Sequence, residues 1–209
     1  MHGDHRYLCS GMRPPHTVAL DSHAAATLRY IRASMEAAGT VAVPGSAGVI
    51  MGMVGLAAAA LASTPALRPR WLVIWLIAAG VAAALGGAIM ARQASRQGFT
   101  LFGAPARKLI LCLAPGLFAG AVMTGVLWEG GHLRAIPGTW LLLYGCALIS
   151  TSAPTTRIVG VLGSLFALLG LITFLMPERL HTLALGAGFG GLHLIFGILI
   201  GQRSRGSED

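Results

Sequence analysis

Charged residues are scarce in this 209-residue sequence. Only 11% of the residues are Asp, Glu, Lys or Arg, against about 25% in an ordinary soluble domain. Hydrophobic residues make up 55% of the chain. A soluble fold of this composition would expose large apolar patches and would aggregate. The composition therefore excludes an ordinary soluble protein and favours one whose outer surface is covered by lipid.

The sequence also has few of the residue patterns that carry common chemistry. Its three cysteines, Cys9, Cys112 and Cys146, are odd in number and lack metal-binding spacing, which excludes a disulfide framework and a zinc motif. It contains no phosphate-binding glycine loop and no serine–histidine–acid arrangement. We therefore expect a non-enzymatic protein that needs no cofactor.

The net charge of +8 does not indicate nucleic-acid binding. The basic residues flank apolar runs of about 20 residues instead of forming a stripe, and this is the arrangement of topology signals. We expect no nucleic-acid partner.

Lys108 is the only lysine among the basic residues, and alanine and glycine are abundant, which favours a bacterial source of high genomic G+C content.

Six apolar segments predict transmembrane helices, because each approaches the roughly 20 residues that cross a bilayer core. No Asp, Glu, Lys or Arg lies inside any of them, as the cost of a charge at bilayer depth requires. The six segments are residues 44–64, 71–91, 109–128, 137–153, 158–176 and 182–201. The expected fold class is therefore all-α, a polytopic membrane helix bundle.

The segment 21–39 predicts an amphipathic helix before the bundle. Leu28 and Ile31 fall on one helical face, and Arg29 and Arg32 lie away from it. The segment is too short and too charged to span, so we expect it at the membrane surface. The expected regions are a disordered tail (1–20), this interfacial helix (21–39), the six-span bundle (40–203) and a polar tail (204–209).

The basic residues also predict orientation. If the N-terminus is cytoplasmic, most of the 15 basic residues flank the spans on the inner side, as the positive-inside rule requires. We therefore expect both termini in the cytoplasm, in the bacterial inner membrane. The basic residues expected at this interface are Arg29, Arg32, Arg92, Arg96, Arg107 and Lys108.

Three residues inside the spans are candidate functional positions. His193 is the only histidine within a span, and an ionisable group in the membrane is a functional candidate by default. The alternative is a neutral, structural His193 that is hydrogen-bonded to a neighbouring helix. Pro115 and Gly116 interrupt the third span, which predicts a kink, and such breaks line substrate sites in some transporters.

Two Glu-x-x-His pairs are weaker candidates for a metal site. Glu129 and His132 follow the third span, and Glu178 and His181 follow the fifth. Paired Glu-x-x-His motifs bind two metals in some helical bundles. Here Gly130-Gly131 and Pro177 favour loops at these positions, so we expect no metal.

Glycine makes up 29 residues, and several Gly-xxx-Gly pairs predict closely packed helices. The pairs are Gly48/Gly52, Gly116/Gly120, Gly186/Gly190 and Gly197/Gly201.

A Pro-Gly pair also opens the first span (Pro44-Gly45) and the fourth (Pro137-Gly138), which leaves open an inverted three-plus-three repeat.

Two functions remain open from the sequence. The first is a small membrane protein whose N-terminal helix and basic loop engage lipid, a cytoplasmic protein or a second copy of the chain. The second is a transporter of a small solute or ion that uses the kinked third span and His193. A polar cavity would favour the transporter, but the spans offer few polar groups with which to build one.

Overall fold

The computed structural model describes residues 27–28, 31, 43–96, 104–153 and 155–205. The chain divides into two units, Met1–Ala38 and Gly39–Asp209. In the first unit the described residues Thr27, Leu28 and Ile31 are helical and exposed. The predicted tail 1–20 and the remainder of the predicted amphipathic helix, with Arg29 and Arg32, lie outside the described residues.

Six segments of the described chain are long and apolar enough to cross a membrane, which confirms the predicted all-α membrane bundle. The first five are single helices, and the sixth combines three consecutive helical stretches. The helices are α2 (Gly45–Ser63), α3 (Trp71–Arg96), α4 (Ala104–Glu129), α5 (Ile136–Thr151), α6 (Arg157–Leu175), α7 (His181–Leu185), the π-helix η4 (Gly186–Leu192) and α8 (His193–Arg205). Short 3₁₀ turns precede three of them: η1 (Arg68–Arg70), η2 (Leu133–Ala135) and η3 (Glu178–Leu180).

Several helices extend beyond the apolar segments that predicted them. α3 continues to Arg96 and α4 begins at Ala104, where the sequence predicted an end at residue 91 and a start at residue 109. Apolar content marks only the part of a helix that crosses hydrocarbon, and helical hydrogen bonding can continue into the polar interface. α8 likewise continues to Arg205, two residues into the predicted polar tail.

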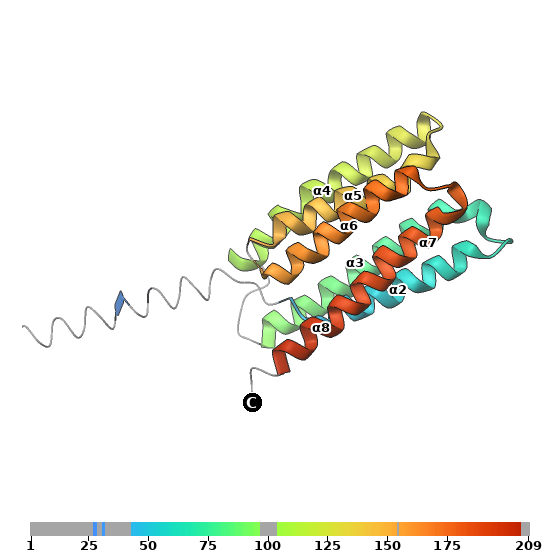
Figure 1. Cartoon of the computed structure of the whole chain (residues 1–209). Helices are drawn as coiled ribbons and strands as arrows, with labels where there is room; N and C mark the ends of the chain where they lie inside the picture. The colour runs from blue at the N-terminus through green and yellow to red at the C-terminus, as the bar shows by residue number, and fades with distance from the viewer. Residues whose placement is uncertain (1–26, 29–30, 32–42, 97–103, 154, 206–209) are drawn as a thin grey trace, which may run out of the picture. The chain divides into compact units, whose positions relative to one another are not determined.

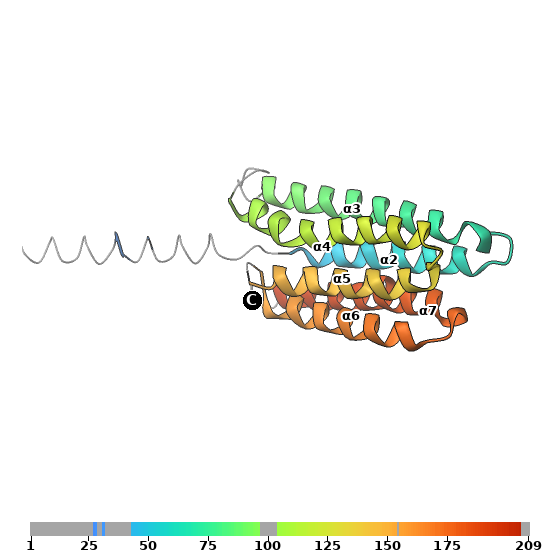
Figure 2. The ribbon, with the colours of Figure 1, turned by 90° about the horizontal axis from the view of Figure 1, so that it is seen from above.

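The helices of the second unit form two layers of three. α2 contacts both α3 and α8 in one layer, and α5 contacts both α4 and α6 in the other. Figure 1 shows the two layers one above the other. Figure 2, seen from above, places α3 and α4 at one edge of the layers and α6 and α7 at the opposite edge.

Glycines bring the helix backbones into contact inside each layer. A Cβ added to Gly52 of α2 would lie 2.7 Å from the backbone nitrogen of Leu194 in α8. A Cβ added to Gly163 of α6 would lie 2.7 Å from the carbonyl oxygen of Gly145 in α5. Side chains larger than hydrogen do not fit at these positions, so the close packing that the Gly-xxx-Gly pairs predicted is confirmed for α2 with α8.

The two Pro-Gly pairs do not have equivalent surroundings. A Cβ on Gly45 would meet the backbone of α8, whereas a Cβ on Gly138 would meet the ring of Phe174 in α6. The first glycine therefore faces the last span and the second faces the span that follows it. This difference gives no support to an exact three-plus-three repeat.

The helices of the two layers contact each other mainly along one edge. α6 contacts α8 and η4, and α5 contacts α7. At the opposite edge, Trp75 and Gly86 are the buried residues of α3, and the apolar window of α4 has no buried residue. The space between the layers is therefore closed along the α6–α8 edge and is bordered by the mostly exposed helices α3 and α4 along the opposite edge.

Candidate functional site: a cavity between the layers

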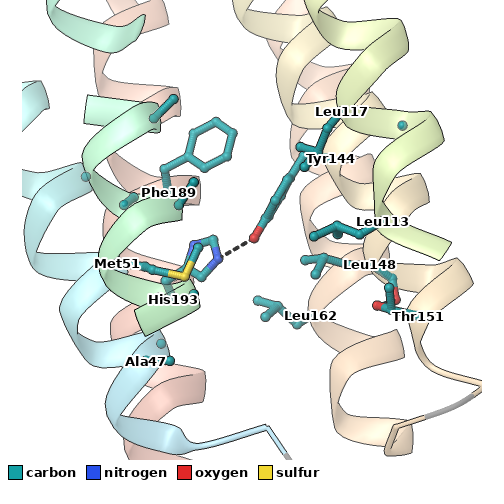
Figure 3. Close-up of a pocket in the computed structure, with 18 of the residues that line it drawn as sticks. Ala47, Met51, Leu113, Leu117, Tyr144, Leu148, Thr151, Leu162, Phe189 and His193 are labelled. Atoms are coloured by element: carbon teal, nitrogen blue, oxygen red, sulfur yellow. Dashed lines mark hydrogen bonds between the residues drawn. The ribbon is translucent and has the colours of Figure 1, made fainter. Parts of the chain in front are cut away.

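A cavity of about 550 Å³ lies between the two layers (Figure 3). All six spanning segments contribute to its lining. Ala79 and Ala83 of α3 and Leu117 of α4 line the cavity and are also exposed. The cavity is therefore accessible from the α3–α4 edge, which faces lipid in a membrane. Its volume lies in the range of about 300–1,000 Å³ that small-molecule sites occupy.

The lining is mostly Ala, Gly, Leu, Val and Met, and its hydroxyl groups are already engaged. Thr151 Oγ1 donates to the Leu148 carbonyl at 2.8 Å, and Thr155 Oγ1 donates to the Thr151 carbonyl at 2.6 Å. These hydroxyls satisfy backbone groups of their own segment. They therefore add little polarity to the cavity surface.

One hydrogen bond crosses the cavity and joins the two layers. Tyr144 of α5 and His193 of α8 meet with 2.8 Å between the hydroxyl oxygen and Nε2 (Figure 3). His193 is 5% exposed, so the bond is largely shielded from solvent. His193 is therefore hydrogen-bonded to another helix, as its structural interpretation expects, and whether it also has a functional role stays a prediction.

Two further rings, Phe166 and Phe189, pack against the two rings that form this bond. Tyr144 lies edge-on to Phe166 with 5.0 Å between ring centroids, and Phe166 lies edge-on to His193 at 5.1 Å. Phe189, one turn before His193, contacts all three other rings, and its own ring is nearly parallel to the imidazole. Such edge-to-face contacts restrict rotation of each ring. The Tyr144–His193 pair is therefore held in one arrangement.

The backbone directly before His193 is a π-helix, which the sequence analysis did not predict. η4 contains four glycines in the sequence GAGFGGL and ends directly before His193. π-helical turns inside longer helices occur frequently at functional positions. Here the turn lies where the two layers meet, because η4 contacts both α2 and α6.

Two buried nitrogens at the cavity have no hydrogen-bond partner. They are Nε1 of Trp75 and Nδ1 of His193, and both residues line the cavity. The carbonyls of Gly188 and Phe189 interact with the imidazole but complete no bond of standard geometry to Nδ1. Their position favours a proton on Nδ1, so that Nε2 accepts from the Tyr144 hydroxyl.

Tryptophans close one end of the space between the layers. Trp71 at the start of α3 stacks on Trp140 of α5, with 6.1 Å between ring centroids and 11° between planes. Trp71 Nε1 donates to Thr182 at 3.0 Å, and Trp140 Nε1 donates to Thr124 at 2.7 Å. This network ties four spanning segments together where α3, α5 and α7 begin.

Of the two candidates in the third span, only Gly116 lines the cavity that His193 also lines. α4 remains helical through Pro115, which is exposed and does not line the cavity. Gly116 does line the cavity, and a Cβ there would lie 2.7 Å from Cβ of Ala147. Gly116 therefore serves the contact between α4 and α5, which is the ordinary packing role of such a glycine.

Of the four Glu-x-x-His residues, His132 lies in the loop between α4 and η2, as predicted, and the other three lie in helical turns at helix ends. Glu129 ends α4, and Glu178 lies in η3, where it forms an ion pair with Arg134. His181 begins α7 and is buried, with 3.2 Å between its Nε2 and the Met176 carbonyl. His132 is exposed. Among the described residues no three potential ligands gather into a metal-binding group.

The predicted interfacial basic residues of the second unit lie at one end of the bundle. Arg92 and Arg96 are exposed near the end of α3, and Arg107 and Lys108 are exposed near the start of α4.

The sequence analysis missed Tyr144 and Trp75. The available signal was that Tyr144 is the only tyrosine inside a predicted span.

Comparisons of the chain with protein-family profiles, with curated proteins and with solved structures find no match.

Proposed function

We propose that this chain is a non-enzymatic, multi-pass protein of the bacterial inner membrane that binds a lipid chain in the cavity between its layers. Both termini face the cytoplasm in this proposal, as the distribution of basic residues predicts. The observation that carries it is the apolar cavity of about 550 Å³ with access from the α3–α4 edge. A lipid chain has the same apolar character and reaches this edge from the bilayer without crossing water.

Retention of lipid tests this proposal. Lipid that stays bound through repeated detergent exchange is extracted from the purified protein and counted by mass spectrometry. We expect about one molecule per chain in the unmodified protein. A83F fills the cavity from α3, and A84F places the same ring on a residue outside the cavity lining. A83F should retain severalfold less lipid than A84F, and equal retention in the two variants would contradict the proposal.

A transporter of a small solute or ion is the second candidate. It is favoured by the asymmetry of the cavity, which ends at the Trp71–Trp140 stack but reaches Thr155 and Ile200 near the other end. A cavity open to one side is what alternating access requires. The apolar lining disfavours a charged solute. Proton flux into proteoliposomes that is lost in a stable H193Q variant would favour the transporter over the lipid-binding protein.

A further inference from the structure

The two ends of the bundle differ in charge. One end holds the starts of α2, α4 and α6 and the ends of α3 and α8 (Figure 1). Exposed basic residues at this end are Arg92, Arg96, Arg107, Lys108, Arg157 and Arg203. No Asp or Glu among the described residues lies at this end, whereas Glu129 and Glu178 accompany four arginines at the other. Among the described residues, the positive charge is therefore uncompensated at this end and about half compensated at the other.

The cavity reaches the basic end. Lining residues there are close in sequence to the basic residues: Leu109 follows Lys108, Val159 comes two residues after Arg157, and Ile200 comes three before Arg203. At 1.5 Å of rise per residue these separations correspond to about 1.5–4.5 Å along the helix axes. The side chains of Lys and Arg are long enough to bridge such distances. Basic residues of three helices therefore lie at about the same depth as this end of the cavity.

We propose that the cavity takes an acyl chain of an anionic phospholipid, whose phosphate is held by the basic residues at this mouth. The inference rests on the lipid-binding function proposed above and adds the class of lipid and its orientation. The apolar lining accounts for the chain, and the uncompensated positive charge accounts for the headgroup. A free phosphate ion would leave the apolar cavity without an occupant.

Quenching of Trp75 fluorescence by bromine atoms on the acyl chains tests this inference. Trp75 is 4% exposed and lines the cavity, so it reports lipid inside the cavity, while Trp128 is 57% exposed and would report bulk lipid. The triple variant W71F/W128F/W140F retains Trp75 as its single tryptophan. It is reconstituted with brominated phosphatidylglycerol or with brominated phosphatidylcholine of the same chains.

We expect phosphatidylglycerol to quench at a mole fraction at least about fivefold lower than phosphatidylcholine, because each basic residue near the surface contributes about a factor of five. The difference should shrink at high salt, which screens the headgroup attraction. Equal quenching by both lipids would overturn the anionic preference and leave the lipid-binding cavity intact. Absence of quenching by either lipid would overturn the proposed function itself.

Charge removal at each end locates the headgroup. K108Q/R157Q removes two charges at the basic mouth, and R70Q/R179Q removes two at the opposite end as the matched control. We expect the first pair to abolish the preference and the second to leave it within about twofold. The reverse result, or equal loss in both, would overturn the proposed orientation. If the single-tryptophan protein does not fold, the two charge variants are made with all tryptophans present. The ratio of phosphatidylglycerol to phosphatidylcholine that each variant retains then measures the same preference.

Discussion

A methyl group added at Gly52 should separate α2 from α8. The Cβ of alanine would lie 2.7 Å from the Leu194 backbone nitrogen and 2.8 Å from the Gly190 carbonyl oxygen. Both atoms belong to backbone, so neither moves without its helix. To reach an ordinary contact of 3.4 Å the helices must part by about 0.7 Å.

The expected magnitude follows from two opposing effects. Overpacking of a close contact costs about 1–3 kcal/mol. Replacement of glycine by alanine in a helix contributes about 1 kcal/mol in the opposite direction. The 0.7 Å separation also weakens the neighbouring contacts of Gly48 and Gly55 with the same helix segment. We expect G52A to lower the free energy of unfolding by about 1–2 kcal/mol.

Gly80 of α3 and Gly125 of α4 supply the matched controls. A Cβ at either residue would meet nothing within 4 Å, and neither residue lines the cavity. G80A and G125A should therefore be neutral, or more stable by up to about 1 kcal/mol. Reversible unfolding in mixed micelles, followed by circular dichroism, measures all three variants. A G52A protein as stable as G80A would refute the backbone contact between α2 and α8.

Three further predictions follow from the site and the topology. Y144F leaves Nε2 of His193 without its hydrogen-bond partner and should lower the free energy of unfolding by about 0.5–2 kcal/mol. H193Q keeps a hydrogen-bonding group at this position and should lower it less. A Y144F protein as stable as the unmodified one would show that this bond does not hold the layers together. H132A should leave the melting temperature unchanged because the His132 ring is exposed. H181A should lower the free energy of unfolding by about 1 kcal/mol because the His181 ring is buried. Neither variant should carry stoichiometric metal when measured by elemental analysis. Reporter fusions should alternate between outside and inside, beginning outside, and two successive fusions on one side would remove the six-span topology. The fusion points are Thr64, Arg96, Gly131, Ala153 and Met176.

The sequence predicted the spans well because the bilayer constrains each segment independently. A run of about 20 residues without charge is sufficient for a membrane-crossing helix, whatever its neighbours are. For the same reason the helix ends were less accurate. The helical hydrogen bonds of α3 continue past Ala91 into residues that the bilayer does not select for hydrophobicity.

The candidate site was only partly predictable. His193 was found because a titratable ring in a span is unusual, but Tyr144 lies 49 positions earlier on another helix. Their contact depends on the rotation of α5 and α8, and no local pattern encodes that rotation. Gly116 was selected for a break in α4, but its lack of a side chain instead serves close packing against Ala147.

The sequence by itself determined that six segments are long and apolar enough to cross a membrane, and that most of the described basic residues of the second unit lie at one end of the bundle. Both properties depend on the transfer of individual residues between water and lipid, which is local and additive along the chain. Only the tertiary structure decided which glycines are buried against backbone, where the layers separate, and which rings face the cavity. These depend on pairwise contacts between distant segments, and lipid solvates an unpaired apolar helix face as well as another helix does.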